Sequence, residues 1–214
     1  MSSSILETTE STNPQNAAVA NRGYVTFEEY LEQSSDTRIC EWVDGEIITM
    51  PGASFEHQDI SGFLLTAMRI YVTQNDSGIV LSSPFAMKLE EQRRGREPDI
   101  LFVSKERQHL FKKTYLDGAA DLAVEIISPE SIGRDRGEKF IEYEAAGIKE
   151  YWIIDPDRKI TEFYRLGENG FYNLIQTPDG IFRSEVLSGF FLKTEWLWQN
   201  PLPTRTAFQE LNLI

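Results

Sequence analysis

The 214-residue chain is predicted to fold as one α/β or α+β domain. Two patterns predict this class: a long stretch with a 3.6-residue hydrophobic period comes before three short β-type runs, and a second helical stretch leads directly into a fourth β-type run. The third observation is composition. With 41% hydrophobic and 12% aromatic residues the chain can bury a sizeable core, which excludes a mostly disordered protein.

Charge and cysteine content narrow the class of protein further. There are 21 Lys and Arg residues against 34 Asp and Glu, so the formal net charge is −13, which disfavours wholesale binding to polyanions. The single cysteine, Cys40, cannot form an internal disulfide and lacks zinc-type spacing, which fits a reducing cytoplasm. No apolar run approaches the roughly 18 residues that cross a membrane, and no signal peptide is visible, so we expect a cytoplasmic protein.

The first third of the chain is predicted to begin with a tail and a short helix. Residues 1–22 are rich in Ser, Thr, Asn and Gln and are expected to form a flexible tail, because they cannot offset the entropy lost on ordering. Thr26 stands three residues before Glu29, which is the spacing of a capping box and predicts a helix over TFEEYLEQ.

A hairpin and a long helix are expected next. The Asp44-Gly45 pair lies between the two apolar stretches of residues 38–50, which is a strong hairpin signal. Residues 54–74 carry apolar side chains with the period of an amphipathic helix. This stripe consists of Ile60, Phe63, Leu64, Ala67, Met68 and Tyr71.

The remaining elements are mostly strands. Three β-type runs are IVLSSPFAMKL, PDILFVS and DLAVEIIS, at residues 79–89, 98–104 and 121–128. A second helix is predicted over residues 135–146, because Gly147 followed by apolar Ile148 is typical of a left-handed helix stop. A fourth strand, EYWIID, follows directly, and the runs ITEFYRL and FYNLIQ resemble a hairpin.

The expected organisation is a tail over residues 1–22, a single domain over residues 23–200 and a C-terminal extension over residues 201–214. The stretch FFLKTEWLWQNPLP, at residues 190–203, contains enough aromatic side chains for a dimer contact. The alternative is that these aromatics cover the core of their own domain.

Two carboxylates stand where a core strand should be apolar. Glu125 lies inside the run DLAVEII, and burying an isolated carboxylate costs several kcal/mol by order of magnitude. Asp99 opens another strand directly after Pro98. If the two strands are neighbours, both carboxylates can converge to hold Mg²⁺ or Mn²⁺, and a phosphodiester would complete the site. The alternative is a turn role for Asp99 and an ion pair between Glu125 and a helix residue.

Lys139 is the third candidate. Asp135, Lys139 and Tyr143 are spaced four apart on the predicted helix and so share one face, which must pack on the sheet. In isolation, Lys139 is better interpreted as a solvated residue paired with Asp135, and only the order of the motifs favours a site role.

Taken in order, these motifs resemble the PD-(D/E)XK nuclease superfamily, and more narrowly its Uma-type bacterial family of restriction-endonuclease-like proteins. The resemblance rests on Asp99 in EPDILFV, on Glu125 in AVEIISPES and on Lys139 in the block of residues 134–156, and it covers about residues 24–190. It implies a restriction-endonuclease-like core, with a central mixed sheet flanked by helices and extra N-terminal and C-terminal hairpins. Ile127 occupies the place of the usual strand lysine, which the family has on the following helix.

The resemblance also implies a function, the metal-assisted hydrolysis of a phosphodiester in DNA. Asp99 and Glu125 would hold Mg²⁺ or Mn²⁺, and Lys139 would orient the attacking water or offset charge in the transition state. Tyr143 would hold the lysine, contact phosphate or simply pack in the core.

The family also has a glutamate in the early hairpin and a histidine in the first long helix. Glu46 and His57 occupy those places here, with Glu41 and Glu56 as second choices. For His57 the alternative is an ordinary helix histidine that is partly exposed.

Binding to DNA requires local positive charge in so acidic a chain. Residues 93–113 contain seven Lys and Arg against three Asp and Glu, a net charge of +4. Arg93, Arg94 and Arg96 are therefore candidate contacts to nucleic acid, unless they only balance acidic neighbours. Two other functions remain open: a catalytically silent binding or assembly module, and a metal-dependent hydrolase of a smaller phosphate ester.

Overall fold

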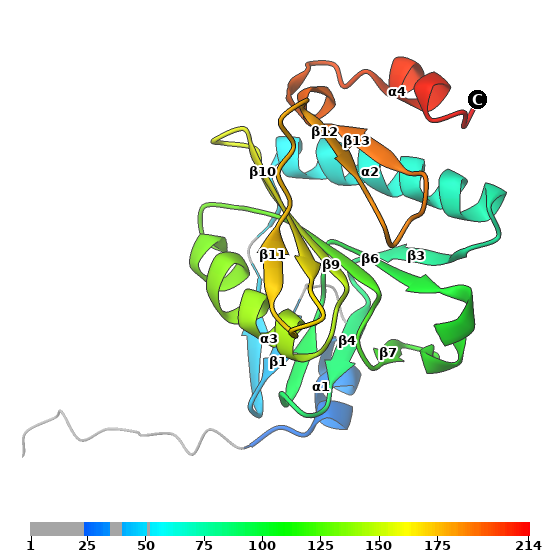
Figure 1. Cartoon of the computed structure of the whole chain (residues 1–214). Coiled ribbons are helices and arrows are strands. Elements are labelled where there is room, and N and C mark those ends of the chain that lie inside the picture. The colour runs from blue at the N-terminus through cyan, green and yellow to red at the C-terminus, as the bar shows by residue number, and fades with distance from the viewer. Residues whose placement is uncertain (1–23, 35–39, 51) are drawn as a thin grey trace, which may run out of the picture.

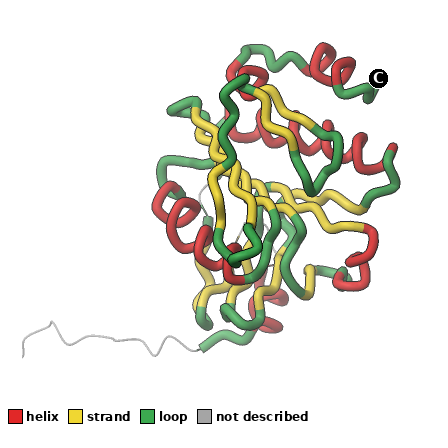
Figure 2. Tube along the Cα trace, viewed as in Figure 1, coloured by secondary structure: helices red, strands yellow, loops and turns green. Residues whose placement is uncertain are grey.

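The computed structural model describes residues 24–34, 40–50 and 52–214. The predicted tail of residues 1–22 lies outside this part of the chain, as do residues 38 and 39 of the predicted hairpin. The described strands form a six-stranded sheet, a five-stranded sheet and a two-stranded hairpin, with helices packed around them (Figures 1 and 2). The predicted α+β class, with mixed sheets flanked by helices, is confirmed.

The six-stranded sheet lies at the centre of the molecule. Its strand order is β11-β10-β9-β8-β6-β3, and only β8 and β9 run parallel. The bounds are β3 Gly78–Ser82, β6 Ile100–Ser104, β8 Leu122–Ile126, β9 Glu150–Asp155, β10 Ile160–Leu166 and β11 Tyr172–Leu174. The strands predicted over residues 98–104, 121–128 and 150–155 are all present, and β10 and β11 form the predicted antiparallel hairpin.

The five-stranded sheet has the order β2-β1-β5-β4-β7, with β4 and β7 parallel. The bounds are β1 Cys40–Val43, β2 Glu46–Thr49, β4 Ala86–Leu89, β5 Arg94–Arg96 and β7 Tyr115–Asp117. The prediction of one strand over residues 79–89 is wrong, because β3 and β4 belong to different sheets. Pro84 lies between them, and a proline has no N–H group for a strand ladder.

The two local motifs predicted near the N-terminus are confirmed. Helix α1, Phe27–Ser34, begins with a capping box in which the Thr26 N–H donates to Glu29 Oε2 at 2.8 Å and the Glu29 N–H donates to Thr26 Oγ1 at 3.2 Å. The hairpin turn places Asp44 at φ +50° and Gly45 at φ +91°, as a two-residue turn of this kind requires.

One face of the six-stranded sheet is covered by α2, Phe55–Gln74, which lies across it in Figure 1. Ser54 caps this helix by accepting a hydrogen bond from the His57 N–H at 3.1 Å. The predicted stripe from Ile60 to Met68 is buried, and Tyr71 packs at its edge.

The C-terminal residues complete the same core. They form the hairpin of β12, Ile181–Arg183, and β13, Phe191–Lys193, followed by the 3₁₀ helix η4, Thr194–Trp198, and α4, Thr204–Glu210. Trp196, Leu197 and Phe208 are buried there. The aromatics of residues 190–203 therefore cover the core of their own domain, so they are not an exposed surface for a dimer contact.

The other face of the six-stranded sheet packs against α3, Lys139–Ala145, and against the five-stranded sheet. Helix α3 ends as predicted: Gly147 has φ +80°, and the Ile148 N–H donates to the Tyr143 carbonyl at 3.0 Å. Its beginning differs from the prediction, because residues 134–138 form one π-helical turn, η3. A short 3₁₀ helix, η2, spans Lys105–Leu110.

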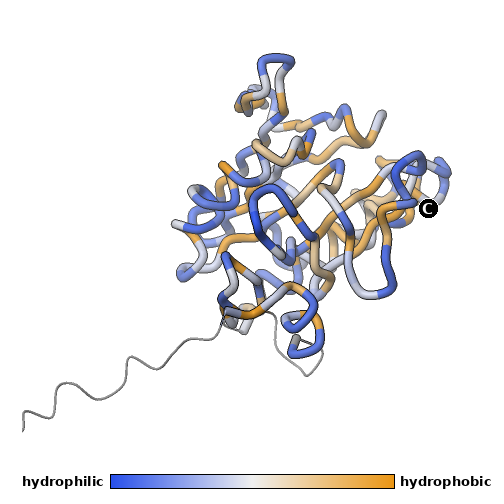
Figure 3. The backbone as a smooth tube through the Cα atoms, turned by 90° about the horizontal axis from the view of Figure 1, so that it is seen from below, coloured by the Kyte–Doolittle hydropathy of each residue, from blue (hydrophilic) through white to orange (hydrophobic). Residues whose placement is uncertain are grey.

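The hydropathy of the chain follows this layering. In Figure 3 the hydrophilic stretches lie mostly in loops that project outward, and the hydrophobic stretches lie mostly in the segments between them. Among the described residues, no helix is both long and apolar enough to pass through a bilayer.

Candidate active site

Pairing between two strands sets the positions of the predicted carboxylates. Strands β6 and β8 are antiparallel, with Ile100 opposite Val124 and Leu101 opposite Ala123. One further step in this register places Asp99 opposite Glu125. Asp99 Oδ2 accepts a hydrogen bond of 2.7 Å from the Ile126 N–H, which fixes the aspartate against the end of β8. The structure thus brings the two carboxylates together.

Both carboxylates line a cavity of about 70 Å³ at this end of the sheet. Six further side chains on its wall are ionisable and come from β1, α2, the segment before β6, the turn η3 and the start of α3. They are Glu41, His57, Glu97, Arg134, Asp135 and Lys139. A space of this size can hold a few water molecules.

Lys139 is buried among carboxylates. Its side chain is 5% exposed, and Nζ lies 2.9 Å from Glu41 Oε1, 3.0 Å from Glu125 Oε2 and 3.3 Å from Asp135 Oδ1. Burial alone lowers the pKa of a lysine, but Glu125, Glu41 and Asp135 together hold the pKa of Lys139 well above its ordinary value. Lys139 is therefore a permanent cation of the site, and a solvated pair with Asp135 is excluded.

Glu125 is held from two sides. The Tyr143 hydroxyl donates to Oε1 at 2.8 Å, while Lys139 lies against Oε2. Burial raises the pKa of Glu125 well above its usual range, with Asp135 and Asp99 adding to the rise and Lys139 opposing it. The ion pair with a helix residue, which was the alternative to a site role, is thus present inside the site. Tyr143 is fully buried, so it positions Glu125 and cannot reach a phosphate.

His57 also belongs to this group. Its Nε2 lies 3.2 Å from Asp99 Oδ2, and its side chain is only 12% exposed. Burial lowers the pKa of His57, but the contact with Asp99 outweighs it and leaves the pKa raised. His57 is therefore not an ordinary exposed helix histidine, and it contacts the same Asp99 oxygen that accepts the hydrogen bond from the Ile126 N–H.

The early hairpin contributes Glu41 rather than Glu46. Glu46 is exposed on β2, whereas Glu41 is 1% exposed on β1 and lies 2.9 Å from Lys139 and 2.7 Å from Arg96. Burial raises the pKa of Glu41, but Lys139 and Arg96 lower it by more than burial raises it, so the net shift is downward. The first choice, Glu46, is wrong as a wall residue, and Glu56 is exposed outside the cavity wall. Period-2 alternation could not separate the candidates, because Cys40 and Trp42 on either side of Glu41 are buried as well.

Glu97 was not predicted as a site residue. It is 7% exposed and lines the cavity, and its Oε2 has no hydrogen-bond partner among the described residues. Burial raises the pKa of Glu97 to about 7, and the negative charge of Glu41 adds to the effect. The Tyr30 hydroxyl lies 2.9 Å from Glu97 Oε1 and 2.8 Å from the Cys40 carbonyl. One hydroxyl proton cannot serve two acceptors, so a proton on Glu97 satisfies both contacts.

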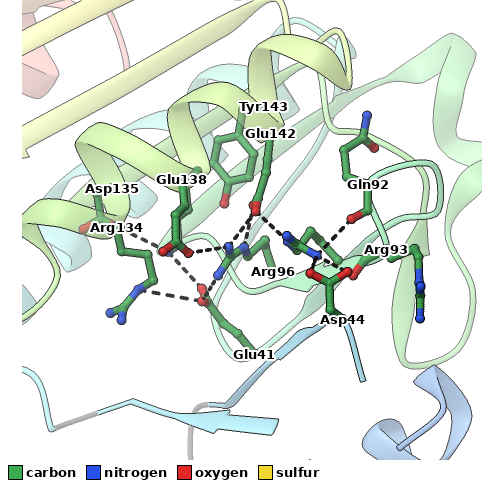
Figure 4. Close-up of polar contacts among 12 residues, drawn as sticks. Glu41, Asp44, Gln92, Arg93, Arg96, Arg134, Asp135, Glu138, Glu142 and Tyr143 are labelled. Carbon is green, nitrogen blue, oxygen red and sulfur yellow. Dashed lines mark hydrogen bonds and ion pairs between the residues drawn. The ribbon is translucent and has the colours of Figure 1, made fainter. Parts of the chain in front are cut away.

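The expectation that Arg96 contacts nucleic acid is wrong. Arg96 is fully buried, with two hydrogen bonds to Glu142, at 2.7 and 2.9 Å, and one to Glu41 at 2.7 Å (Figure 4). Arg94 is engaged by Glu142 and Asp44. Both arginines tie the five-stranded sheet to α3 and do not offer their charge to a ligand.

Arg93 is exposed, and its guanidinium contacts the ring and hydroxyl of Tyr24. It remains a candidate for contact with nucleic acid, at the tip of the turn before β5.

The two carboxylates suit a magnesium site that has few protein ligands and is completed by water. No group of three or more His, Cys, Asp or Glu side chains in the described part of the chain is arranged to hold a metal ion. Magnesium, however, typically takes one or two carboxylates and keeps several water ligands. The opposed Asp99 and Glu125, beside a cavity that admits water, match that requirement.

Comparison with known proteins identifies the family and the fold. The Uma2 family model, described as "Putative restriction endonuclease", matches residues 27–195. An uncharacterised Synechocystis protein, sll1609, is 25% identical over 149 residues, which is 69% of this chain and 84% of that one. A crystal structure titled as a "putative nuclease belonging to DUF820" from Anabaena variabilis has the same fold, with a TM-score of 0.67 and 18% identity, and the match covers 81% of this chain and 97% of that one. The chain belongs to the Uma2 family of restriction-endonuclease-like proteins.

Proposed function

We propose that the protein is a Mg²⁺- or Mn²⁺-dependent endonuclease that hydrolyses phosphodiester bonds in DNA in the cytoplasm. The observation that carries this proposal is the opposition of Asp99 and Glu125 across β6 and β8, beside one cavity and with Lys139 bonded to Glu125. A purely structural module gains nothing from this arrangement, since buried carboxylates are costly.

Each residue has a distinct task in this proposal. Asp99 and Glu125 would hold the metal, which when bound polarises a phosphate and makes water a stronger nucleophile. His57 and the Ile126 N–H fix the rotamer of Asp99 through its Oδ2. Lys139 keeps Glu41, Glu125 and Asp135 close together by neutralising part of their charge. Tyr143 fixes the other oxygen of Glu125.

The test is cleavage of supercoiled plasmid and single-stranded DNA with Mg²⁺, Mn²⁺ or a chelator. Wild type is expected to nick DNA only with metal, and Asp99→Asn is expected to lose the activity while keeping its melting temperature within a few degrees. The control is Asp179→Asn, the same substitution at an exposed aspartate that lies outside the cavity wall. Nicking by wild type in chelator, or by Asp99→Asn at the wild-type rate, would contradict the proposal.

A hydrolase of a smaller phosphate ester is the second candidate. One observation favours it. Arg94 and Arg96 are held in internal ion pairs, so little positively charged surface is left to bind a nucleic-acid polymer. Hydrolysis of a dinucleotide or an aryl phosphodiester by a protein that leaves plasmid and oligonucleotides intact would support this candidate over the endonuclease.

A further inference from the structure

Among the basic side chains at or behind the cavity wall, two are paired closely with carboxylates and one is not. Lys139 faces three carboxylates and is 5% exposed. Arg96, behind Glu41, has its guanidinium shared between Glu41 and Glu142 and is fully buried. Neither can turn toward a substrate without leaving buried carboxylates unpaired, which is strongly unfavourable inside a protein.

Arg134 is arranged differently. It lines the cavity at the start of η3, and its side chain is 20% exposed. The nearest carboxylate oxygen, Glu41 Oε2, lies 3.9 Å from Nε, which is too far for a hydrogen bond. The buried Nε–H has no hydrogen-bond partner among the described residues. In Figure 4, Arg134 and Arg96 reach Glu41 from opposite sides, and only Arg96 is hydrogen-bonded to it.

A guanidinium whose buried Nε–H has no hydrogen-bond partner favours a ligand with hydrogen-bond acceptors. A buried donor without a partner destabilises the protein, and a ligand that accepts its hydrogen bond removes that cost. The planar fork of arginine matches two oxygens of a phosphate, which a lysine cannot do as a point charge. The carboxylates attract a cation, and Arg134 is the group on the same wall that attracts an anion.

We propose that Arg134 binds the non-bridging oxygens of the substrate phosphodiester, and that Lys139 is a positioning residue that does not touch the substrate. This inference rests on the proposed function, since it assigns the phosphate contact within that same site. It replaces the expectation that Lys139 offsets charge on the phosphate.

The experiment measures binding and cleavage for wild type, Arg134→Ala, Arg134→Lys and Arg183→Ala. Arg183 is an exposed arginine paired with Asp179 outside the cavity wall, so its variant controls for the loss of one positive charge. Binding of a fluorescent single-stranded 12-mer is followed by anisotropy in Ca²⁺ at several salt concentrations, and cleavage is followed in Mg²⁺. Mn²⁺ binding is measured by calorimetry.

Arg134→Ala is expected to weaken oligonucleotide binding about 10-fold and to make the slope of log K against log salt shallower by about 0.7, the value of one phosphate contact on a single strand. Cleavage should fall further than binding. Mn²⁺ binding should stay the same or tighten, because a positive charge has left the wall. Arg134→Lys should recover the slope but not the cleavage rate, and Arg183→Ala should match wild type in all three.

The outcomes separate the two proposals. If wild type cleaves DNA but Arg134→Ala keeps the slope and rate of Arg183→Ala, the role of Arg134 is refuted and the proposed function stands. Loss of Mn²⁺ binding in both Arg134 variants would also refute it, because it would show a structural role in the carboxylate wall. If wild type neither binds nor cleaves any DNA, the proposed function fails and the role of Arg134 fails with it.

Discussion

Lys139 shows how one side chain can stabilise a site that it does not serve directly. Three carboxylates converge on its ammonium group inside the protein. Removing the lysine leaves those charges facing each other with little solvent to screen them. Removal of one partner from such a buried ionic group typically costs about 3–5 kcal/mol.

Lys139→Met is therefore expected to be strongly destabilised at pH 8, and less so at pH 5, where the carboxylates can take up protons. Denaturant unfolding at both pH values checks this. Adding Glu125→Gln to Lys139→Met should recover part of the loss, because one of the unpaired charges is then gone. An equal loss at both pH values, with no recovery in the double variant, would show that the lysine acts through packing alone.

Glu97 makes the stability of the metal-free protein depend on pH. Its folded pKa of about 7 lies above the ordinary 4.5, so the folded protein holds a proton that the unfolded chain releases between these values. Stability is therefore lost as pH rises through this window, by about 3 kcal/mol in total. Above pH 7 the folded state releases the proton as well, and the loss levels off.

Glu97→Gln stays neutral in both states and removes this dependence. Its stability relative to wild type should rise from near zero at pH 4.5 to about 3 kcal/mol at pH 8, measured by denaturant unfolding in chelator. Glu56→Gln, at an exposed glutamate on α2, serves as the control and should show no such rise. A difference between Glu97→Gln and wild type that is independent of pH would rule out the titration of Glu97 as its cause.

At the scale of residues, the sequence predicted the side chains that differ in polarity or position from the residues next to them in the chain. Glu125 stands out because it interrupts an apolar strand, and Asp99 because it follows Pro98. Glu41 and Arg96 could not be assigned, because a buried ion pair looks like two surface charges until the strands that carry them are brought together. Glu97 was missed because its burial depends on Tyr30, which lies far away in the sequence.

Two glycines test how closely neighbouring elements are packed. A Cβ atom on Gly78, in β3, would lie 2.2 Å from the Val103 carbonyl oxygen of β6, which only a shift of the backbone can relieve. Gly62 lies on the exposed face of α2, with nothing within 4 Å of such an atom.

Gly62→Ala is expected to stabilise the protein by about 1 kcal/mol, because alanine loses less entropy in a helix. Gly78→Ala should destabilise it by about 1–3 kcal/mol through overpacking against β6. The two melting curves, measured side by side, check both signs. A stabilised Gly78→Ala variant would mean that β3 moves away from β6 at little cost.

At the scale of elements, short sequence motifs correctly predicted the features that are stabilised by interactions between residues close in the chain. The capping box of α1, the Asp44-Gly45 turn and the stop at Gly147 are all completed within a few residues. The π-helical turn at residues 134–138 carries no such signal. Strands β5 and β7, of three residues each, are stabilised mainly by β1 and β4 beside them, so their own sequences could not reveal them.

Across the whole molecule, the net charge of −13 limits how nucleic acid can bind. Many of the basic side chains described are already paired with carboxylates, Arg94, Arg107 and Lys149 among them. The expected slope of log K against log salt for a DNA oligonucleotide is therefore shallow, roughly −1 to −2. Anisotropy titrations between low and moderate salt measure it, and a slope steeper than about −5 would reveal a basic surface that these pairs do not hide.

The global arrangement was predicted in class but not in detail. The order of helices and strands indicated an α/β or α+β domain, and the family resemblance implied a central mixed sheet, which the six-stranded sheet provides. The second sheet was not foreseen because β4 and β7 pair in parallel across a long connection, a contact that no short window of sequence contains.

The pairing of β6 with β8 has a consequence for how this family can diverge. Asp99 stands directly before β6 and Glu125 lies within β8, so the pairing of these two strands sets the distance between the two carboxylates. Descendants can lengthen, shorten or replace the turns around the cavity, and so change what enters it, while the two carboxylates keep their separation. Inserting a single residue in either strand would instead turn one carboxylate to the opposite layer of the sheet. The proposed metal site is thus inherited with the strand register, and substrate preference can evolve separately.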